Sequence, residues 1–359
     1  MINKTKLFGT DGIRGTAGLF PLDDESIIKL GKSIGELFKG AGIIIGRDTR
    51  ASGEKLQALL AAGIANKARI SYCGIIPTPG LSFITDHSDF NYGIMITASH
   101  NPYQDNGIKI FNSSGEKISR DMEEKLEDIF FSLDKPGINK NNQRYPGDIN
   151  SESTRYKDIY KDFLLEQAAG LRVKKQKVVV DCSHGAVYEI APLVFSKLGL
   201  ETEISAAAPD GQNINLDCGA ASPGNLGKEV IARNAAVGIA FDGDGDRVIF
   251  ADNRGNILDG DHSLYIISKY LLETNREFNK TAVGTIMSNL GLEKALAELG
   301  ITFPRTPVGD YHVYQEMKRV NAIIGGEQSG HTILRSLQRT GDGILTALYF
   351  LEAIAYFDL

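Results

Sequence analysis

Two loops in the sequence contain residues that could together transfer a phosphoryl group. The first is Thr97-Ala98-Ser99-His100-Asn101-Pro102, which directly follows the apolar run from Gly93 to Ile96. If that run is a strand, the Ser99 hydroxyl lies at its end, where a nearby base and cation would activate it as a nucleophile. A serine in such a turn is more often a helix cap. The assignment therefore depends on a cation site elsewhere in the chain.

The second loop, Asp242-Gly243-Asp244-Gly245-Asp246-Arg247, follows the apolar run from Val237 to Phe241. Carboxylates at alternate positions of a glycine-rich turn can point at one centre, and hard cations such as Mg²⁺ prefer oxygen ligands. Such a cluster is unfavourable without a counter-ion, although a solvated acidic turn is the ordinary alternative. A calcium-binding EF-hand is excluded, because Arg247 and Asn253 occupy the positions that need Gly and Glu.

A phosphatase that uses Asp242 as its nucleophile is a weaker alternative for the same loop. Haloacid-dehalogenase-like phosphatases also place Asp-x-Asp after a strand. Their pattern continues with Thr or Val, whereas this chain has Asp246 at that position.

Three more segments carry polar groups suited to a phosphorylated ligand. Phe8-Gly9-Thr10-Asp11-Gly12-Ile13-Arg14-Gly15 offers Arg14 for bidentate phosphate binding. Gly325-Gly326-Glu327-Gln328-Ser329-Gly330-His331 combines a carboxylate, a hydroxyl and an imidazole, which suit sugar hydroxyl groups. Lys109 is close to Ser99 in sequence and could act as a general acid or base. Each signal is weak alone, since exposed Arg and Lys side chains and glycine-rich turns are common.

The bulk composition favours a compact globular protein. The chain has 359 residues, of which 42% are hydrophobic and 23% charged, with a net charge of −6; that balance indicates neither disorder nor nucleic-acid binding. The three cysteines form no CxxC pair, which argues against disulfides and zinc. We expect a cytoplasmic protein without membrane contact, because no signal sequence is visible and the apolar stretch from Ile344 to Tyr356 is interrupted by Glu352.

Short β-branched runs precede the polar loops, and segments with helical periodicity lie between them. Glu25 to Lys39 is one such helix, with Asp23 or Asp24 as its cap. The strands are expected at 43–45, 93–96, 178–180, 237–241, 283–287 and 322–324. This alternation predicts an α/β fold of three consecutive domains with mixed sheets, in which strand-end loops form an active-site cleft. The predicted limits are 1–150, 151–254 and 255–359, with the polar segment Asp134 to Ser153 as a linker.

Taken in order, the segment with Arg14, the Ser99 loop, the aspartate loop and the segment 325–331 closely resemble the motifs of the α-D-phosphohexomutase superfamily. The resemblance covers essentially the whole chain. Asn213-Ile214-Asn215, Cys218-Gly219 and the Gln in Gly-Glu-Gln-Ser-Gly-His are most similar to the bacterial phosphoglucosamine mutase branch.

The resemblance implies a mutase that moves a phosphoryl group between O6 and O1 of a hexosamine phosphate, converting glucosamine 6-phosphate to glucosamine 1-phosphate. Phosphorylated Ser99 would donate the group and give a 1,6-bisphosphate intermediate. One Mg²⁺ per chain would be held by Asp242, Asp244, Asp246 and an oxygen on Ser99. Glucose or glucosamine 1,6-bisphosphate would act as activator.

The resemblance also implies roles for the remaining site residues. Ser99, with Lys109, His100, His331 and Arg14, would form the catalytic set. Substrate would be bound by Glu327, Ser329, Gly309 and Arg247. The expected partner is a small phosphosugar, with a homodimer as one option for assembly.

Two departures from the family pattern leave alternatives open. Pro307 and Tyr311 stand where phosphoglucosamine mutases have Lys and Arg, so a phosphomannomutase or phosphoglucomutase is an alternative. Family members also have a fourth domain with an Arg-x-Ser-Gly-Thr-Glu loop that binds phosphate, and no Ser-Gly-Thr occurs here. We therefore expect that this domain is absent and turnover impaired, with a non-catalytic phosphosugar-binding remnant as the other alternative.

Overall fold

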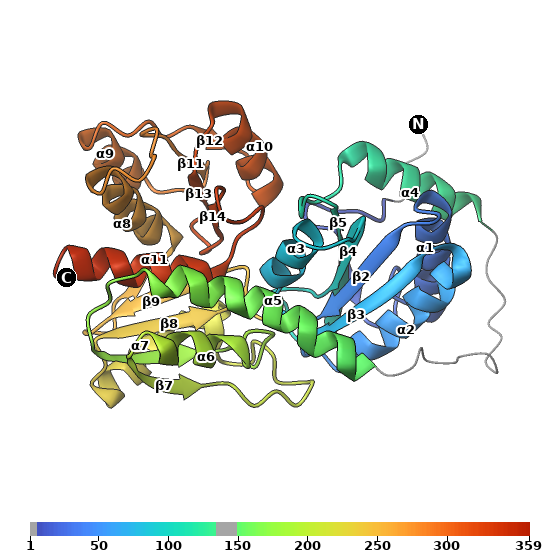
Figure 1. The fold of residues 1–359 in the computed structure, drawn as a ribbon, viewed down its shortest axis with the longest axis horizontal. Helices are drawn as coiled ribbons and strands as arrows, with labels where there is room; N and C mark the ends of the chain where they lie inside the picture. Colours follow the sequence, from blue (N-terminus) through green and yellow to red (C-terminus); the bar gives the residue numbers. More distant parts are fainter. Residues whose placement is uncertain (1–5, 134–148) are drawn as a thin grey trace.

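The computed structural model describes residues 6–133 and 149–359 and contains three mixed β-sheets, each with helices packed against it (Figure 1). The predicted α/β fold with mixed sheets is confirmed. The predicted limits at 150 and 254 stay predictions. Of the expected linker, residues 134–148 lie outside the described part of the chain, and a helix begins at Ile149.

The first sheet has the strand order β1-β5-β4-β2-β3. Its strands are β1 (Ile13–Thr16), β2 (Gly42–Arg47), β3 (Arg69–Ile75), β4 (Tyr92–Ile96) and β5 (Asp105–Asn112). Strand β2 runs parallel to β3 and β4, whereas β5 runs antiparallel to β4 and β1. The isoleucines of β2 are buried whichever face they point to, because helices cover both faces of the sheet.

The helices of this unit are α1 (Asp24–Leu37), α2 (Gly53–Ile64), α3 (Thr78–Asp86) and α4 (Arg120–Ser132), with a 3₁₀ turn at Ala65–Lys67. Ile27, Leu30 and Ile34 of α1 share one hydrophobic cluster with the inward side chains of α2, α4 and the sheet. The predicted cap of α1 is Asp23, whose carboxylate accepts from the Ser26 amide at 3.0 Å.

The second sheet repeats the pattern of the first, in the order β10-β9-β8-β6-β7. Its strands are β6 (Lys177–Asp181), β7 (Glu201–Ser205), β8 (Val237–Phe241), β9 (Val248–Asp252) and β10 (Ile257–Leu258). Strand β6 is parallel to β7 and β8, and β9 is antiparallel to β8. Its helices are α6 (Ile190–Lys197) and α7 (Pro223–Arg233), with a 3₁₀ turn at Gly219–Ala221.

The third sheet is smaller, in the order β12-β11-β13-β14. Its strands are β11 (Ala282–Thr285), β12 (Arg305–Thr306), β13 (Ile324–Gly326) and β14 (Thr332–Leu334), and its helices are α8 (Gly260–Glu273), α9 (Leu290–Glu298) and α10 (Asp310–Val320). The strand expected at 283–287 ends at Thr285, because Ile286 and Met287 turn out to solvent. The strand expected at 322–324 begins only at Ile324.

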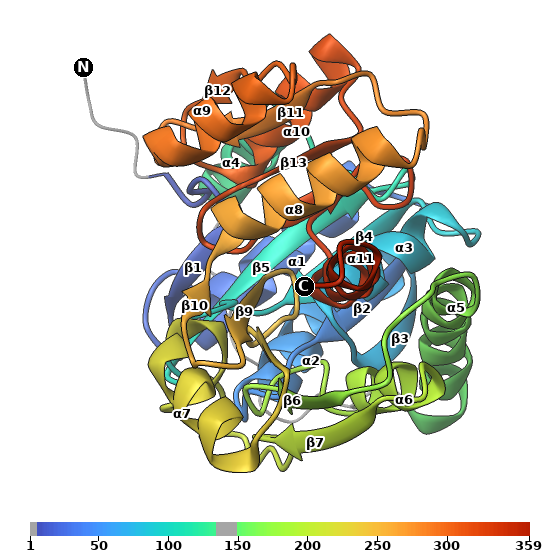
Figure 2. The ribbon, with the colours of Figure 1, turned by 90° about the vertical axis from the view of Figure 1, so that its left-hand side faces the viewer.

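Two long helices join the three units. Helix α5 (Ile149–Ala169) runs along the junction of the first two sheets, and α11 (Gly343–Tyr356) packs on α5, α8 and the second sheet (Figures 1 and 2). Helix α5 buries Tyr156, Tyr160, Leu164 and Ala168, which lie four residues apart on one stripe. These side chains belong to a hydrophobic cluster that includes residues from all three units. No helix in the described ranges has the length and apolar character needed to span a membrane.

Candidate active site

The candidate active site is built from three loops that occupy the same topological position in the three sheets. Each loop leaves the end of a strand that has a parallel neighbour and leads into an antiparallel strand: 97–104 joins β4 to β5, 242–247 joins β8 to β9, and 327–331 joins β13 to β14. Backbone groups are free at such a strand end, where open α/β sheets place their ligands. The fold therefore explains why chemistry-bearing residues recur at these positions.

Ser99 lies at the meeting point of the first two loops. Its side chain is fully buried, and its backbone has a left-handed φ of 53°. The Ser99 hydroxyl donates to Asp242 Oδ2 at 2.6 Å, and His100 Nδ1 lies 3.4 Å from Ser99 Oγ. The structure thus brings together a serine and an aspartate that are far apart in sequence. The contact places the predicted nucleophile beside the predicted cation ligands.

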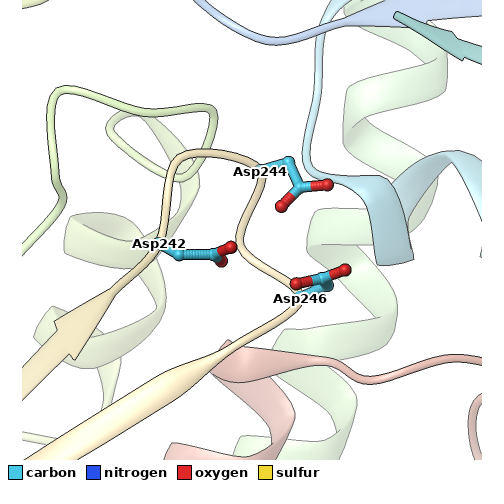
Figure 3. A group of neighbouring side chains, drawn as sticks. All are labelled: Asp242, Asp244 and Asp246. Atoms are coloured by element: carbon cyan, nitrogen blue, oxygen red, sulfur yellow. The ribbon is translucent and has the colours of Figure 1, made fainter. Parts of the chain in front are cut away.

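The carboxylates of Asp242, Asp244 and Asp246 converge from one turn (Figure 3). One oxygen from each lies within 4.8 Å of the others, and all three side chains are buried. Two buried oxygens, Asp244 Oδ1 and Asp246 Oδ1, have no hydrogen-bond partner. Buried unpartnered carboxylate oxygens grouped in this way fit a hard divalent cation such as Mg²⁺.

The electrostatics of the turn support the same reading. Burial and repulsion from Asp246 and Asp244 raise the pKa of Asp242 well above its ordinary value. Burial alone would also raise the pKa of Asp246, but Lys109 and His331 hold it well below its usual range. Asp242 is thus shifted toward its neutral, protonated form. A bound cation would favour its charged form instead.

Lys109 is buried beneath the acidic turn. Its ammonium nitrogen lies 3.0 Å from Asp244 Oδ2, 3.4 Å from Asp246 Oδ2 and 3.2 Å from Asp11 Oδ2. Burial would lower the pKa of Lys109, but these three carboxylates raise it well above its ordinary value. Lys109 is therefore positively charged in this arrangement and suited to act as a fixed cation, because a raised pKa makes it a poor proton donor.

The three loops open onto a cleft of about 520 Å³. Of the residues predicted for the site, Arg14, His100, Asp246, Arg247, Gly309, Glu327 and His331 line this cleft. Ser329 does not. It lies in an adjoining hollow that shares Glu327 and Val308 with the main cleft. Ser99 and Lys109 are buried next to the cleft and are not among the residues that line it.

The pKa values of the two histidines of the site shift in opposite directions. Burial, together with the charges of Arg247 and Arg14, lowers the pKa of His100 to about 4, so its imidazole is neutral near pH 7. His331 is buried; desolvation lowers its pKa, but Asp246 and Asp310 raise it overall. His331 Nε2 accepts from the Gly341 amide at 3.0 Å, while Nδ1 lies 3.6 Å from Asp246 Oδ2.

Several residues that support the site were not identified from the sequence. Thr78 donates to Asp244 Oδ2 at 2.6 Å from α3. Lys117 bridges Asp11 of the first unit and Asp310 of the third. Gly309, in contrast, is among the residues predicted from the sequence, and its amide donates to Glu327 Oε1 at 2.9 Å. Because these contacts join residues far apart in the chain, the local sequence around Thr78 or Lys117 carries no signal for them.

Comparison with known proteins agrees with this architecture. Family models of the phosphoglucomutase/phosphomannomutase alpha/beta/alpha domains I, II and III match residues 5–137, 158–255 and 259–358. A phosphoglucosamine mutase from Ectopseudomonas mendocina is 44% identical over 97% of this chain and 78% of its own length. One from Solibacter usitatus is 42% identical over 96% of this chain and 77% of its own length.

Solved structures show the same fold at lower identity. A phosphoglucomutase/phosphomannomutase family protein from Burkholderia thailandensis has a TM-score of 0.81 at 24% identity, over 98% of this chain and 77% of that one. The N-acetylphosphoglucosamine mutase of Aspergillus fumigatus, solved with GlcNAc-6P and magnesium, has a TM-score of 0.65 at 16% identity, over 100% of this chain and 79% of that one. The buried serine and acidic turn, the three matched domains and the close relatives agree: the chain belongs to the phosphoglucomutase/phosphomannomutase family and is a phosphosugar mutase.

Proposed function

We propose that this mutase interconverts glucosamine 6-phosphate and glucosamine 1-phosphate through a phosphoryl group carried on Ser99. The observation that supports this most directly is the 2.6 Å contact between Ser99 Oγ and Asp242 Oδ2 within a group of three buried carboxylates. The hexosamine as substrate is supported by the relatives, which are phosphoglucosamine mutases.

In the proposed reaction, phosphorylated Ser99 gives its phosphoryl group to a free sugar hydroxyl. The bond from phosphorus to Ser99 Oγ breaks, a bond to the sugar oxygen forms, and the hydroxyl proton passes to a base. The 1,6-bisphosphate then reorients within the site so that its other phosphate faces Ser99. That phosphoryl group is transferred to Ser99, which leaves the product. The neutral imidazole of His100, 3.4 Å from Ser99 Oγ, is placed to take a proton, while cationic Lys109 offsets negative charge.

Asp242, Asp244 and Asp246, with an oxygen on Ser99, would hold the Mg²⁺. When bound, the ion would neutralise charge that develops on the transferring phosphoryl group. Arg14 and Arg247 add positive charge at the cleft. Arg247 Nε is buried without a hydrogen-bond partner, 3.9 Å from Asp246 Oδ1. A guanidinium with free donors is suited to phosphate oxygens. Glu327, Ser329 and Gly309 are proposed to contact sugar hydroxyl groups.

The test is transfer of phosphate to the protein. The chain is incubated with Mg²⁺ and glucose 1,6-bisphosphate, and intact-mass spectrometry follows the gain of one phosphoryl group. We expect labelling of the unsubstituted chain and none of Ser99→Ala. If Asp242→Asn abolishes labelling while Ser99→Ala does not, a phosphatase that uses Asp242 as nucleophile is the better description.

Substrate identity is tested separately. Conversion of glucosamine, glucose and mannose phosphates by the same chain is compared, and glucosamine 6-phosphate is expected to give the highest kcat/KM. The ranking of the three sugars, not the absolute rate, decides this point. A preference for mannose or glucose phosphate would contradict the hexosamine assignment.

A further inference from the structure

Arg50 is a fully buried arginine that no part of the proposed mechanism uses. It follows β2, outside the three loops of the site, and its side chain is 1% exposed. Its guanidinium donates to four backbone carbonyls of one segment: those of Ser99 at 2.9 Å, Asn101 at 2.8 Å, Asp105 at 3.0 Å, and Pro102. A single rigid side chain thus fixes the path of the whole Ser99 loop.

Asp48 holds Arg50 in this orientation and extends the support to the Ser99 amide. Arg50 Nε donates to Asp48 Oδ2 at 2.9 Å, and the Thr97 hydroxyl donates to the same oxygen at 2.6 Å. The Thr97 oxygen in turn accepts from the Ser99 amide at 2.9 Å. Both the amide and the carbonyl of Ser99 are therefore bound within one buried network.

Asn215 reaches the same loop from the second unit. Its side-chain amide donates to the Ser99 carbonyl at 2.8 Å and to the Asn101 carbonyl at 3.1 Å, so two of the carbonyls held by Arg50 are shared. The Asn215 backbone amide donates to the Ser183 carbonyl at 2.9 Å, next to β6. Asn215 therefore connects the Ser99 loop of the first unit to the second unit, which carries the aspartate turn.

The aspartate turn is close enough to this junction to be affected by its position. A Cβ atom at Gly243 would lie 2.6 Å from the Ser99 carbonyl oxygen and 2.8 Å from Asn215 Nδ2. Such distances are too short for non-bonded atoms, so only glycine lets the two loops approach this closely. A shift of the Ser99 loop would therefore change the gap between the Ser99 hydroxyl and Asp242.

We propose that Arg50 and Asn215 are positioning residues for phosphoryl transfer at Ser99. Together they hold the loop in its left-handed conformation with the hydroxyl directed at the aspartates. Arg50 acts from within the first unit, and Asn215 fixes the loop relative to the second. The inference rests on the proposed role of Ser99 as the phosphoryl carrier, and neither residue touches the reacting atoms.

The experiment compares variants of the full chain that change one of these contacts. Asn215→Gly removes the amide without adding charge and tolerates the φ of 59° at this position. Its matched control is Asn213→Gly in the same segment, where the lost amide donates to Ala208 O at 3.0 Å and does not reach the Ser99 loop. Arg50→Lys keeps the charge beside Asp48 but lacks the planar fork that binds several carbonyls.

Two measurements are made on each variant. The first is the rate of Ser99 phosphorylation by glucose 1,6-bisphosphate with Mg²⁺, as a function of bisphosphate concentration. The second is hydrogen–deuterium exchange of a peptide that spans residues 97–106. For Asn215→Gly we expect the saturating rate to fall about 10- to 100-fold, because a small misplacement of a reacting group costs on this order. The half-saturating concentration should stay near that of the unsubstituted chain, and exchange in the peptide should be faster.

The outcomes separate the positioning role from the proposed function. If Asn215→Gly matches Asn213→Gly in saturating rate, the positioning role is wrong, even if exchange increases. A change confined to the half-saturating concentration would also overturn it. If the unsubstituted chain takes up no phosphate at Ser99, the proposed function fails and the positioning role fails with it. Because Arg50→Lys can impair folding, its rate counts only where its circular dichroism matches that of the unsubstituted chain.

Discussion

The three aspartates of the acidic turn are kept together by positive charge and hydrogen bonds from the protein itself. Lys109 contacts Asp244 and Asp246, and the Ser99 hydroxyl and the Arg247 amide donate to Asp242. The Arg247 amide is 3.1 Å from Asp242 Oδ1. These contacts leave one oxygen each on Asp244 and Asp246 without a partner. A cation bound by these oxygens should stabilise the folded chain.

We predict that Mg²⁺ raises the melting temperature of the chain and that Asp242→Asn abolishes most of this increase. Binding to the folded state alone stabilises it by about 2.7 kcal/mol when the ion is at a hundred times its dissociation constant. The measurement is thermal melting in MgCl₂ against NaCl of equal ionic strength. Asp217→Asn, which changes an exposed carboxylate in the same unit, is the control and should respond to Mg²⁺ like the unsubstituted chain. An equal response from Asp242→Asn would contradict a cation site at the turn.

At the residue scale, the sequence identifies the side chains that could react or bind a cation. It does not identify the side chains that hold those residues in place. Ser99 and the aspartates are visible because they follow apolar strands in unusual local patterns. Arg50 is not, since an arginine after a strand gives no sign that it will bind four carbonyls in another loop. The same holds for Thr78, whose hydroxyl donates a hydrogen bond to Asp244, 166 positions further along the chain.

At the element scale, the site depends on a strand pattern that is repeated three times. In each sheet a central strand is parallel to two neighbours, and an antiparallel strand follows at the edge of one of them. The sequence predicts six of these strands from their β-branched runs, β2, β4, β6, β8, β11 and β13, but none of the antiparallel strands that follow them. Strand β5 is an example: the segment Asp105–Asn112 contains Asn106, Gly107 and Lys109, so it lacks the continuous apolar run by which the six strands are predicted. Its pairing with β4 is fixed by tertiary contacts.

Helix α11 shows how an element can carry a buried charge at the junction of units. Its cap is Asp342, which accepts from the Leu345 amide at 3.0 Å and from the Tyr160 hydroxyl of α5 at 2.8 Å. Gln338 also donates to it, at 3.0 Å. Burial nevertheless dominates and raises the pKa of Asp342 from 3.8 to about 6.

This shift predicts a pH dependence of stability. Below about pH 4 the carboxyl is protonated in the folded and unfolded chain, and its contribution to stability is fully present. That contribution is lost as the pH rises through about 6, because the folded chain must then hold a buried negative charge. A shift from 3.8 to about 6 corresponds to roughly 3 kcal/mol. Asp342→Asn removes the charge, so its free energy of unfolding minus that of the unsubstituted chain should increase by up to this amount between pH 4 and 7.

Urea unfolding across this pH range measures the difference. Any pH-independent cost of the substitution is constant and does not affect the slope. Asp358→Asn changes an exposed carboxylate two residues beyond the end of the same helix; it is the control and should give a flat difference. A flat difference for Asp342→Asn as well would mean that the buried carboxyl titrates as it does in the unfolded chain.

At the scale of the whole molecule, the first and third units contact each other directly, beside the cleft that Asp310 lines. The turn after β5 supplies Glu116 and Lys117, and α10 supplies Asp310, Tyr314 and Lys318. Lys117 binds Asp310 in a mostly buried position, with 16% and 12% of the two side chains exposed. Lys318 binds Glu116 at 2.9 Å in a more open position, with 36% and 26% exposed. Tyr314 donates to Glu116 at 2.9 Å.

The two ion pairs should differ in their effect on stability because they differ in burial. Lys117→Met removes the cation that Asp11 and Asp310 share, and it leaves Asp310 largely desolvated beside His331. Removing one partner of a buried pair typically costs about 3–5 kcal/mol, whereas an exposed pair contributes about 0–1 kcal/mol. We therefore predict that Lys117→Met lowers the free energy of unfolding several-fold more than Lys318→Met, which breaks the exposed pair of the same interface.

Denaturant unfolding measures both losses in free energy. Small-angle scattering should show a larger radius of gyration only for Lys117→Met, because the third unit then moves away from the first. Equal losses from the two variants would show that Lys117 is no more important than a surface lysine and that the apolar packing of α5 and α11 alone sets the width of the cleft.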